Sequence, residues 1–187
     1  MAQNSSYETV DGEFDSLEDR SFLTMDDYEL KGKNVILRID INSSINPENG
    51  DLLDDTRIKR HSATVKELSD KNARVIVLAH QSRPGKLDFV NLEKHGKRMS
   101  KIIDREITFV DDIYGKKAIQ EIKKIEDGQI LLLDNVRFDE EEKNLKTFEN
   151  DNFKTQSNAT MVKTLAPYAS YFINDAFAAS HLSLIHI

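Results

Sequence analysis

Residues 75–85 read VIVLAHQSRPG, a continuous apolar run that gives way to a polar turn ending in Pro-Gly. A short run that is apolar at successive positions, rather than at alternate ones, is typical of a strand covered on both faces. Comparable runs occupy residues 35–37, 107–110, 130–133 and 171–173. We therefore expect five buried strands.

Segments of helical character separate these runs. Residues 54–71 place four side chains near one face of a helix: Ile58, Ser62, Val65 and Leu68. Asp55 or Thr56 could cap the start of this helix. Weaker patterns of the same type cover residues 92–103, 116–125 and 157–166. Alternating strands and helices predict an α/β fold: a doubly wound, Rossmann-like parallel sheet with helices on both faces, in a single incomplete domain.

The composition narrows the class of protein. The chain has 187 residues, enough for one well-packed domain, and no cysteine, so disulfides and thiolate metal sites are excluded. No apolar run approaches the roughly 20 residues of a membrane span, and the first residues lack the basic and apolar pattern of a signal peptide. We expect a cytoplasmic protein with no membrane partner.

The formal charge of −7 is unevenly distributed. Residues 1–20 carry six acidic side chains and one basic one, a charge of −5, which leaves −2 for the remaining 167 residues. The polar, acidic, aperiodic stretch 1–20 is predicted to be a disordered extension. A net acidic chain argues against non-specific binding of nucleic acid, whereas a local cluster of bases can still attract a small anion.

Polar residues follow every predicted strand. The segments concerned are Asp40-Ile41-Asn42, residues 80–85, Asp111-Asp112, residues 135–137 and Asn174-Asp175. Ligands of open parallel sheets bind outside the carboxyl ends of the strands, so these segments should form one polar rim. Arg83 and Arg137 lie in this rim, Arg57 begins the first helix, and each can fork onto a phosphate or a carboxylate. With His80, Asp40 and Asn42 they predict a site for a small, hydroxylated polyanion.

Each of these residues taken alone has an ordinary structural interpretation. An arginine after a strand is usually a surface charge or a helix cap, and a single histidine is more often structural than functional. The prediction depends on their convergence at one edge of the sheet. The chain contains neither a G-x-x-x-x-G-K-[ST] loop nor a G-x-G-x-x-G turn, so the sequence offers an anion site without a nucleotide site.

Five segments, in order, resemble the motifs of phosphoglycerate kinase. They are residues 37–42 (LRIDIN), 55–58 (DTRI), 78–85 (LAHQSRPG), 133–138 (LDNVRF) and 173–177 (INDAF). The similarity covers roughly residues 22–181, and the HQSRPGK wording is closer to the archaeal branch than to the more usual HLGRP form. The family reversibly transfers a phosphoryl group between 1,3-bisphosphoglycerate and ADP, giving 3-phosphoglycerate and ATP, with magnesium, in glycolysis.

The resemblance implies a role for each matching residue. The substrate-binding set would be Asp40, Asn42, Arg57, His80, Arg83 and Arg137. Asp40 and Asn42 would take the hydroxyl and carboxyl end of phosphoglycerate, while His80, Arg83 and Arg137 would hold the phosphate that is not transferred. Arg57 would be catalytic, lying nearest the acyl phosphate and stabilising charge on the moving phosphoryl group.

The resemblance also implies a domain organisation. Residues 21–181 would form the N-terminal substrate-binding domain. The family has an arginine soon after the histidine that matches His181. Residues 182–187 contain no arginine and look unlike the family. Magnesium with ATP or ADP would bind to a C-terminal domain that is missing here. We therefore expect this chain to bind 3-phosphoglycerate or 1,3-bisphosphoglycerate, to bind no nucleotide or metal, and to be inactive alone.

Two other functions fit the same residues. In the first, Asp40 is the nucleophile of a magnesium-dependent phosphotransferase, although such enzymes place a second acid two residues on, where this chain has Asn42. In the second, the chain is a stand-alone anion-binding module.

Overall fold

The computed structural model describes residues 24–143 and 157–177. The predicted acidic extension (1–20) and tail (182–187) lie outside these ranges, so their organisation stays a prediction. Within the described residues the strands form one five-stranded sheet in the order β3-β4-β2-β1-β5. Their bounds are Asn34–Ile39 (β1), Arg74–Leu78 (β2), Thr108–Val110 (β3), Ile130–Leu133 (β4) and Tyr171–Asp175 (β5). All four pairings are parallel.

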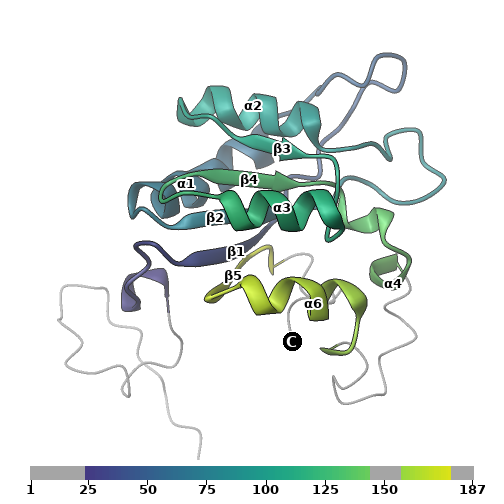
Figure 1. The fold of residues 1–187 in the computed structure, drawn as a ribbon. Coiled ribbons are helices and arrows are strands. Elements are labelled where there is room, and N and C mark those ends of the chain that lie inside the picture. Colours follow the sequence, from purple (N-terminus) through teal and green to yellow (C-terminus); the bar gives the residue numbers. More distant parts are fainter. Residues whose placement is uncertain (1–23, 144–156, 178–187) are drawn as a thin grey trace, which may run out of the picture.

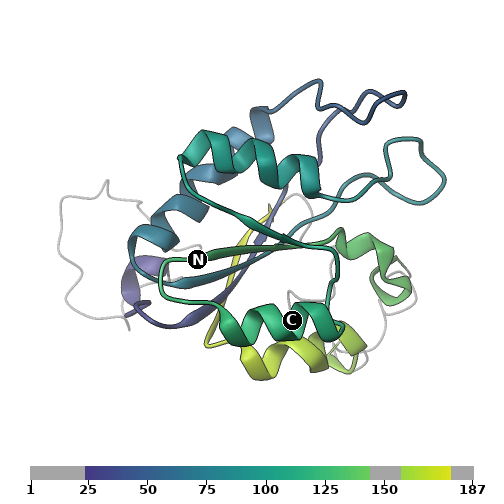
Figure 2. The same ribbon diagram turned by 45° about the horizontal axis from the view of Figure 1, so that its top comes forward.

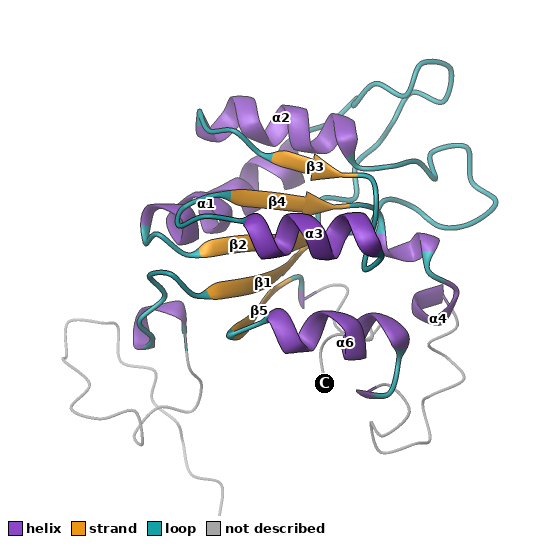
Figure 3. Cartoon of the chain, in the orientation of Figure 1, coloured by secondary structure: helices purple, strands orange, loops and turns teal. Residues whose placement is uncertain are grey.

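Helices cover both faces of this sheet (Figures 1 and 2). The longer ones are α1 (Thr56–Asp70), α2 (Glu93–Ile103), α3 (Lys116–Lys124) and α6 (Thr160–Leu165). A single-turn helix, α4 (Glu140–Lys143), follows β4, and short 3-10 turns occupy Met25–Asp27, Val136–Phe138 and Ala166–Tyr168. Helices α1 and α2 lie on one face, and α3 and α6 lie on the other (Figure 3). The predicted α/β fold, with a doubly wound sheet, is confirmed.

Alternate strand residues enter two separate cores. Val75 and Val77 of β2, and Ala79 directly after it, pack with α1 and α2. Ile76 and Leu78 pack with α3 and α6 instead. Successive side chains of a strand point to opposite faces, so a strand covered on both sides has to be apolar throughout. This requirement explains the continuous runs in the sequence.

The start of α1 differs from the prediction. Asp55 precedes the helix, but its carboxylate binds Lys59 Nζ at 2.8 Å and Arg98 Nε at 2.7 Å and makes no cap hydrogen bond. Asp54 binds Thr56 instead, accepting from its backbone N at 3.1 Å and from its Oγ1 at 2.6 Å. Lys59 and Arg98 occupy the Asp55 carboxylate, so Asp55 stands at the N-cap position without a side-chain cap, and Asp54 accepts from the Thr56 N–H instead.

No helix in the described parts of the chain combines the length and the apolar character that crossing a bilayer requires.

Candidate anion-binding site

The carboxyl ends of β4, β2 and β1 lie next to one another because these are neighbouring strands. Arg38 of β1 pairs with Leu78 of β2, and Asp40 and His80 each follow that pair by two residues. A shared register therefore sets Asp40 and His80 at the same level of the sheet edge. By the same alternation both belong to the face that α3 and α6 cover.

Asp40 is an acceptor for two groups at this edge. Its Oδ2 binds Arg57 Nη1 at 2.6 Å, and its Oδ1 accepts from the backbone N of Asn42 at 3.1 Å. Arg57 comes from the first turn of α1, and half of its side chain is exposed. Helix α1 thus directs Arg57 to the end of β1, as the sequence predicted.

Ser82 links the β1 loop to the β4 loop. Its backbone N donates to Asn42 Oδ1 at 2.9 Å, and its carbonyl oxygen accepts from Arg137 Nη1 at 2.7 Å. The φ of Ser82 is +57°, in the left-handed region that favours glycine, and its Oγ donates to Asp88 Oδ1 at 2.5 Å. This backbone geometry lets one residue hold two predicted site residues.

Beneath this loop lies a buried network of amides. The side chain of Gln81 accepts from Ser43 N at 2.9 Å and donates to Ser43 O at 2.9 Å, and its Oε1 lies 3.0 Å from His95 Nε2. Asn135 Oδ1 accepts from Gln81 N at 3.2 Å, while its Nδ2 donates to Gln81 O at 2.8 Å and to Val90 O at 3.0 Å. The backbone that carries His80 is therefore fixed from both sides.

His80 is neutral at physiological pH. Burial lowers the pKa of His80 to about 3, and the positive charges of Arg38, Arg137 and Arg57 lower it as well. The negative charge of Asp40 raises this pKa but is outweighed. A neutral imidazole can donate one hydrogen bond to an anion and accept another. Bringing an anion to this site would favour protonation of the ring.

Arg137 and Arg83 complete the basic cluster. Burial lowers the pKa of Arg137; the carboxylates of Glu142 and Asp40 oppose this shift, and the nearby charge of Arg83 adds to it. Arg83 itself is exposed. The structure thus brings all six predicted site residues to one lip of the sheet, while the ligand that each of them binds stays a prediction.

Arg38 is a member of this cluster that sequence reasoning did not assign. It lies in β1 with 1% of its side chain exposed, and its Nη2 donates to Glu142 Oε1 at 3.4 Å. Burial lowers the pKa of Arg38, and Glu142 opposes that shift. The signal in the sequence was a charged residue inside the apolar strand VILRI, which demands a buried partner.

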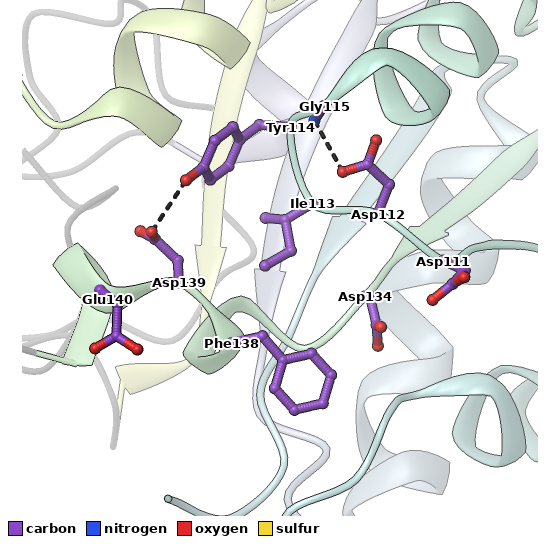
Figure 4. A pocket seen from close by; sticks show the side chains of 9 residues that line it. All are labelled: Asp111, Asp112, Ile113, Tyr114, Gly115, Asp134, Phe138, Asp139 and Glu140. Carbon is purple, nitrogen blue, oxygen red and sulfur yellow. Dashed lines mark hydrogen bonds between the residues drawn. The ribbon is translucent and has the colours of Figure 1, made fainter.

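An acidic hollow of about 500 Å³ lies beside the cluster, at the ends of β3 and β4 (Figure 4). Its lining consists of Asp111, Asp112, Ile113, Tyr114, Gly115, Asp134, Phe138, Asp139 and Glu140. Five carboxylates line this hollow and no basic side chain does, so it repels the anion that the basic cluster attracts. This hollow and the anion site are therefore different places.

Metal-binding geometry bears on the aspartate-nucleophile alternative. In the ranges 24–143 and 157–177, no group of three or more His, Asp or Glu side chains is placed to hold a metal ion. Both oxygens of Asp40 are also engaged, by Arg57 and by Asn42. The surroundings of Asp40 suit a residue that orients a base more than an attacking nucleophile.

Comparison with known proteins identifies the family. The family model described as Phosphoglycerate kinase matches residues 25–185. The chain belongs to the phosphoglycerate kinase family. The phosphoglycerate kinase of Methanococcus maripaludis is 50% identical over 162 residues, and that of Methanothermobacter thermautotrophicus is 49% identical over 162 residues. Both relatives are archaeal phosphoglycerate kinases, as the HQSRPGK motif suggested.

Coverage and solved structures agree with this assignment. The two alignments take in 86% and 87% of this chain, which spans only 39% and 38% of the length of those relatives. The crystal structure of phosphoglycerate kinase from Pyrococcus horikoshii superposes with a TM-score of 0.79 at 30% identity, over 88% of this chain and 39% of that one. The phosphoglycerate kinase from Coxiella burnetii gives 0.66 at 27% identity, over 88% and 38%.

Proposed function

We propose that this chain carries the phosphoglycerate-binding half of a phosphoglycerate kinase. The observation that supports the proposal most is the meeting of Arg57, His80 and Arg137 with Asp40 at one sheet edge, in a chain of this family. A dense cluster of bases above a buried core is costly without an anion to neutralise it. A phosphorylated acid supplies that neutralisation.

The ligand would be shared between the loops as follows. Arg137 and Arg83 would hold the phosphate that is not transferred, with neutral His80 donating one hydrogen bond. Asp40 and Asn42 would receive the hydroxyl and carboxyl end. Arg57, half exposed at the mouth, would face the phosphoryl group in transit and stabilise its charge.

Transfer would need a second component. In this family ADP accepts, or ATP supplies, the phosphoryl group together with magnesium. The 187 residues contain neither a G-x-x-x-x-G-K-[ST] loop nor a G-x-G-x-x-G turn. We propose that residues outside this chain bind the nucleotide and that the 187-residue chain alone turns over no substrate. A cytoplasmic location also stays a prediction.

Calorimetry on the 187-residue chain tests the proposal. We expect weak binding of 3-phosphoglycerate and none of ATP, with or without magnesium. Arg83→Ala should weaken phosphoglycerate binding by more than the roughly 1 kcal/mol of an ordinary exposed ion pair. Lys101→Ala is the matched control, because Lys101 is an exposed base in the last turn of α2, where the chain leads into the start of β3.

The same titration separates the alternatives. Unchanged affinity in Arg83→Ala, or equal losses in both variants, would refute this site. Binding of magnesium together with trapping of a phosphate mimic on Asp40 would instead support the aspartate-nucleophile enzyme. Tight binding of inorganic phosphate with no preference for phosphoglycerate would favour a general anion-binding module.

A further inference from the structure

A buried ion pair joins the basic cluster to α4. Arg38 Nη2 lies 3.4 Å from Glu142 Oε1, and the two side chains are 1% and 0% exposed. Breaking such a pair is costly, whereas replacing both partners by apolar residues of similar volume is often neutral or stabilising. Stability alone therefore gives little reason for a buried pair at this position, which invites a functional explanation.

Arg38 uses only part of its hydrogen-bonding capacity. Its Nε and Nη1 are buried and have no partner in the described part of the chain, and the same holds for Nδ1 of His80. Buried donors without acceptors are rare in proteins, and each one suggests an absent water or ligand. In the described residues, four buried side-chain nitrogens lack a partner: three belong to Arg38 and His80 in the anion site, and the fourth is Nδ1 of His95 in α2.

Arg38 lies close to the other charged groups of the site. It pairs across the sheet with Leu78, two residues before His80, and Asp40 follows Arg38 by two residues. The charge of Arg38 helps to lower the pKa of His80, and the charge of Glu142 acts on both Arg38 and Arg137. Glu142 thus bonds to one nitrogen of a guanidinium whose other two nitrogens have no partner in the described part of the chain.

Neighbouring side chains hold Glu142 in turn. Asp139 Oδ2 accepts from the backbone N of Glu142 at 3.2 Å, at the start of α4. Asp139 Oδ1 accepts from the hydroxyl of Tyr114 at 3.0 Å, and Figure 4 shows this contact across the acidic hollow. The wall of the hollow thus fixes the helical turn that carries Glu142.

We propose that Glu142 is a positioning residue of the phosphoglycerate site: by holding one nitrogen of Arg38, it keeps the rest of that guanidinium beside His80 and Arg137, where an anion binds. This inference rests on the proposed function for the identity of the ligand. Glu142 would touch no ligand itself, since its side chain is fully buried and bonded to Arg38.

The sign of one mutation separates positioning from simple charge. Glu142→Gln keeps the shape but removes a negative charge, so electrostatics alone predicts tighter binding of an anion. Positioning predicts weaker binding of 3-phosphoglycerate, by about tenfold, because Arg38 loses its anchor. Glu140→Gln, on the same helical turn with its side chain 79% exposed, should bind like the wild type. Unchanged or tighter binding by Glu142→Gln would overturn the proposal.

A second variant covers the possibility that Glu142→Gln fails to fold. Replacing both partners, Arg38→Met with Glu142→Met, removes the buried charges together and should restore a wild-type melting temperature. We expect this double variant to bind 3-phosphoglycerate about tenfold more weakly than the wild type. Wild-type affinity in a folded double variant would show that the pair is only structural and would overturn the inference.

A readout without ligand distinguishes failure of this inference from failure of the proposed function. In ¹⁵N-arginine NMR spectra, we expect the Arg38 Nε–H to exchange slowly with solvent in the wild type and in Glu140→Gln, and faster in Glu142→Gln. Equal exchange in all three would overturn the anchoring role. If the wild type binds no phosphoglycerate, the proposed function fails, and this exchange measurement alone decides whether Glu142 positions Arg38.

Discussion

Arg57 Nη1 lies 2.6 Å from Asp40 Oδ2, so the base at the mouth of the site is already paired with an acid before any ligand arrives. Half of the Arg57 side chain is exposed, whereas only 10% of the Asp40 side chain is. A ligand that carries a phosphoryl group can draw Arg57 outward while Asp40 stays in place. Asp40 would then be free to accept a hydroxyl group.

Arg57→Ala should lower the affinity for phosphoglycerate more than it lowers the stability of the fold. A partly exposed ion pair contributes about 0–1 kcal/mol, so we expect the free energy of unfolding in urea to fall by no more than this. Phosphoglycerate affinity should fall more, because a charge-assisted contact is lost. Lys59→Ala, which removes an exposed ion pair with Asp55, is the control and should leave affinity unchanged. A larger effect on folding than on binding would contradict the proposed role.

Ser82 should respond differently to glycine and to alanine. Its φ of +57° costs a residue with a side chain about 1–2 kcal/mol, and glycine removes that cost. Both substitutions lose the hydrogen bond to Asp88, but Ser82→Ala keeps the strain. Urea unfolding should therefore find Ser82→Gly more stable than Ser82→Ala by about 1 kcal/mol. The reverse order would show that the left-handed backbone is not maintained in solution.

Asn135→Ala should destabilise the edge of the sheet. Asn135 is fully buried. Its side chain accepts hydrogen bonds from Gln81 N and Arg137 N and donates hydrogen bonds to Gln81 O and Val90 O. Leaving such groups unpaired costs about 3 kcal/mol in total, by the usual penalty for buried polar atoms. Gln120→Ala, at an exposed position of α3, should change unfolding by less than about 0.5 kcal/mol. Similar effects for the two variants would contradict this account.

The chain should lose stability as the pH falls below 6.5. Burial lowers the pKa of His80 to about 3 and that of His95 to about 4, from an ordinary value of 6.5. The unfolded chain therefore binds more protons than the folded chain in this window. Above pH 6.5 both histidines are neutral in the folded and the unfolded chain, and no stability is lost. Below pH 6.5 each histidine should lower the free energy of unfolding by about 1.4 kcal/mol per pH unit.

His95→Gln tests this pH dependence while keeping a donor near Gln81. Between pH 6 and pH 5, the slope of the unfolding free energy should decrease by the contribution of one histidine, and between pH 7 and pH 8 the wild type and the variant should both be flat. An unchanged slope at acidic pH would mean that His95 is accessible to protons in the folded state.

The sequence predicted the fold well because burial on both faces of a parallel sheet leaves a direct mark, the continuous apolar run. The sequence also predicted that the six candidate site residues lie at the carboxyl edge of the sheet. In a chain of this topology, the loops that carry them follow the ends of the strands. These two inferences depend on local patterns and on a general rule of topology, and neither requires knowledge of a particular distant contact.

What the sequence did not predict depends on distant contacts. Arg38 and Glu142 are 104 residues apart in the chain, and nothing in either segment specifies the other as its partner. The missing side-chain cap at Asp55 has the same origin, because Arg98 of α2 binds the Asp55 carboxylate. The left-handed φ of Ser82 could not be read from a residue type that rarely adopts it.

The strict alternation of β2 has a consequence for how the binding loop tolerates change. Leu78 and, by parity, His80 belong to the face of α3 and α6, while Ala79 and Gln81 turn toward α1 and α2. Removing one codon between residues 74 and 80 would exchange these assignments, setting an amide beside Arg38 and burying the imidazole against α2. In this segment, recognition of the anion depends on the number of residues as strictly as on their identity.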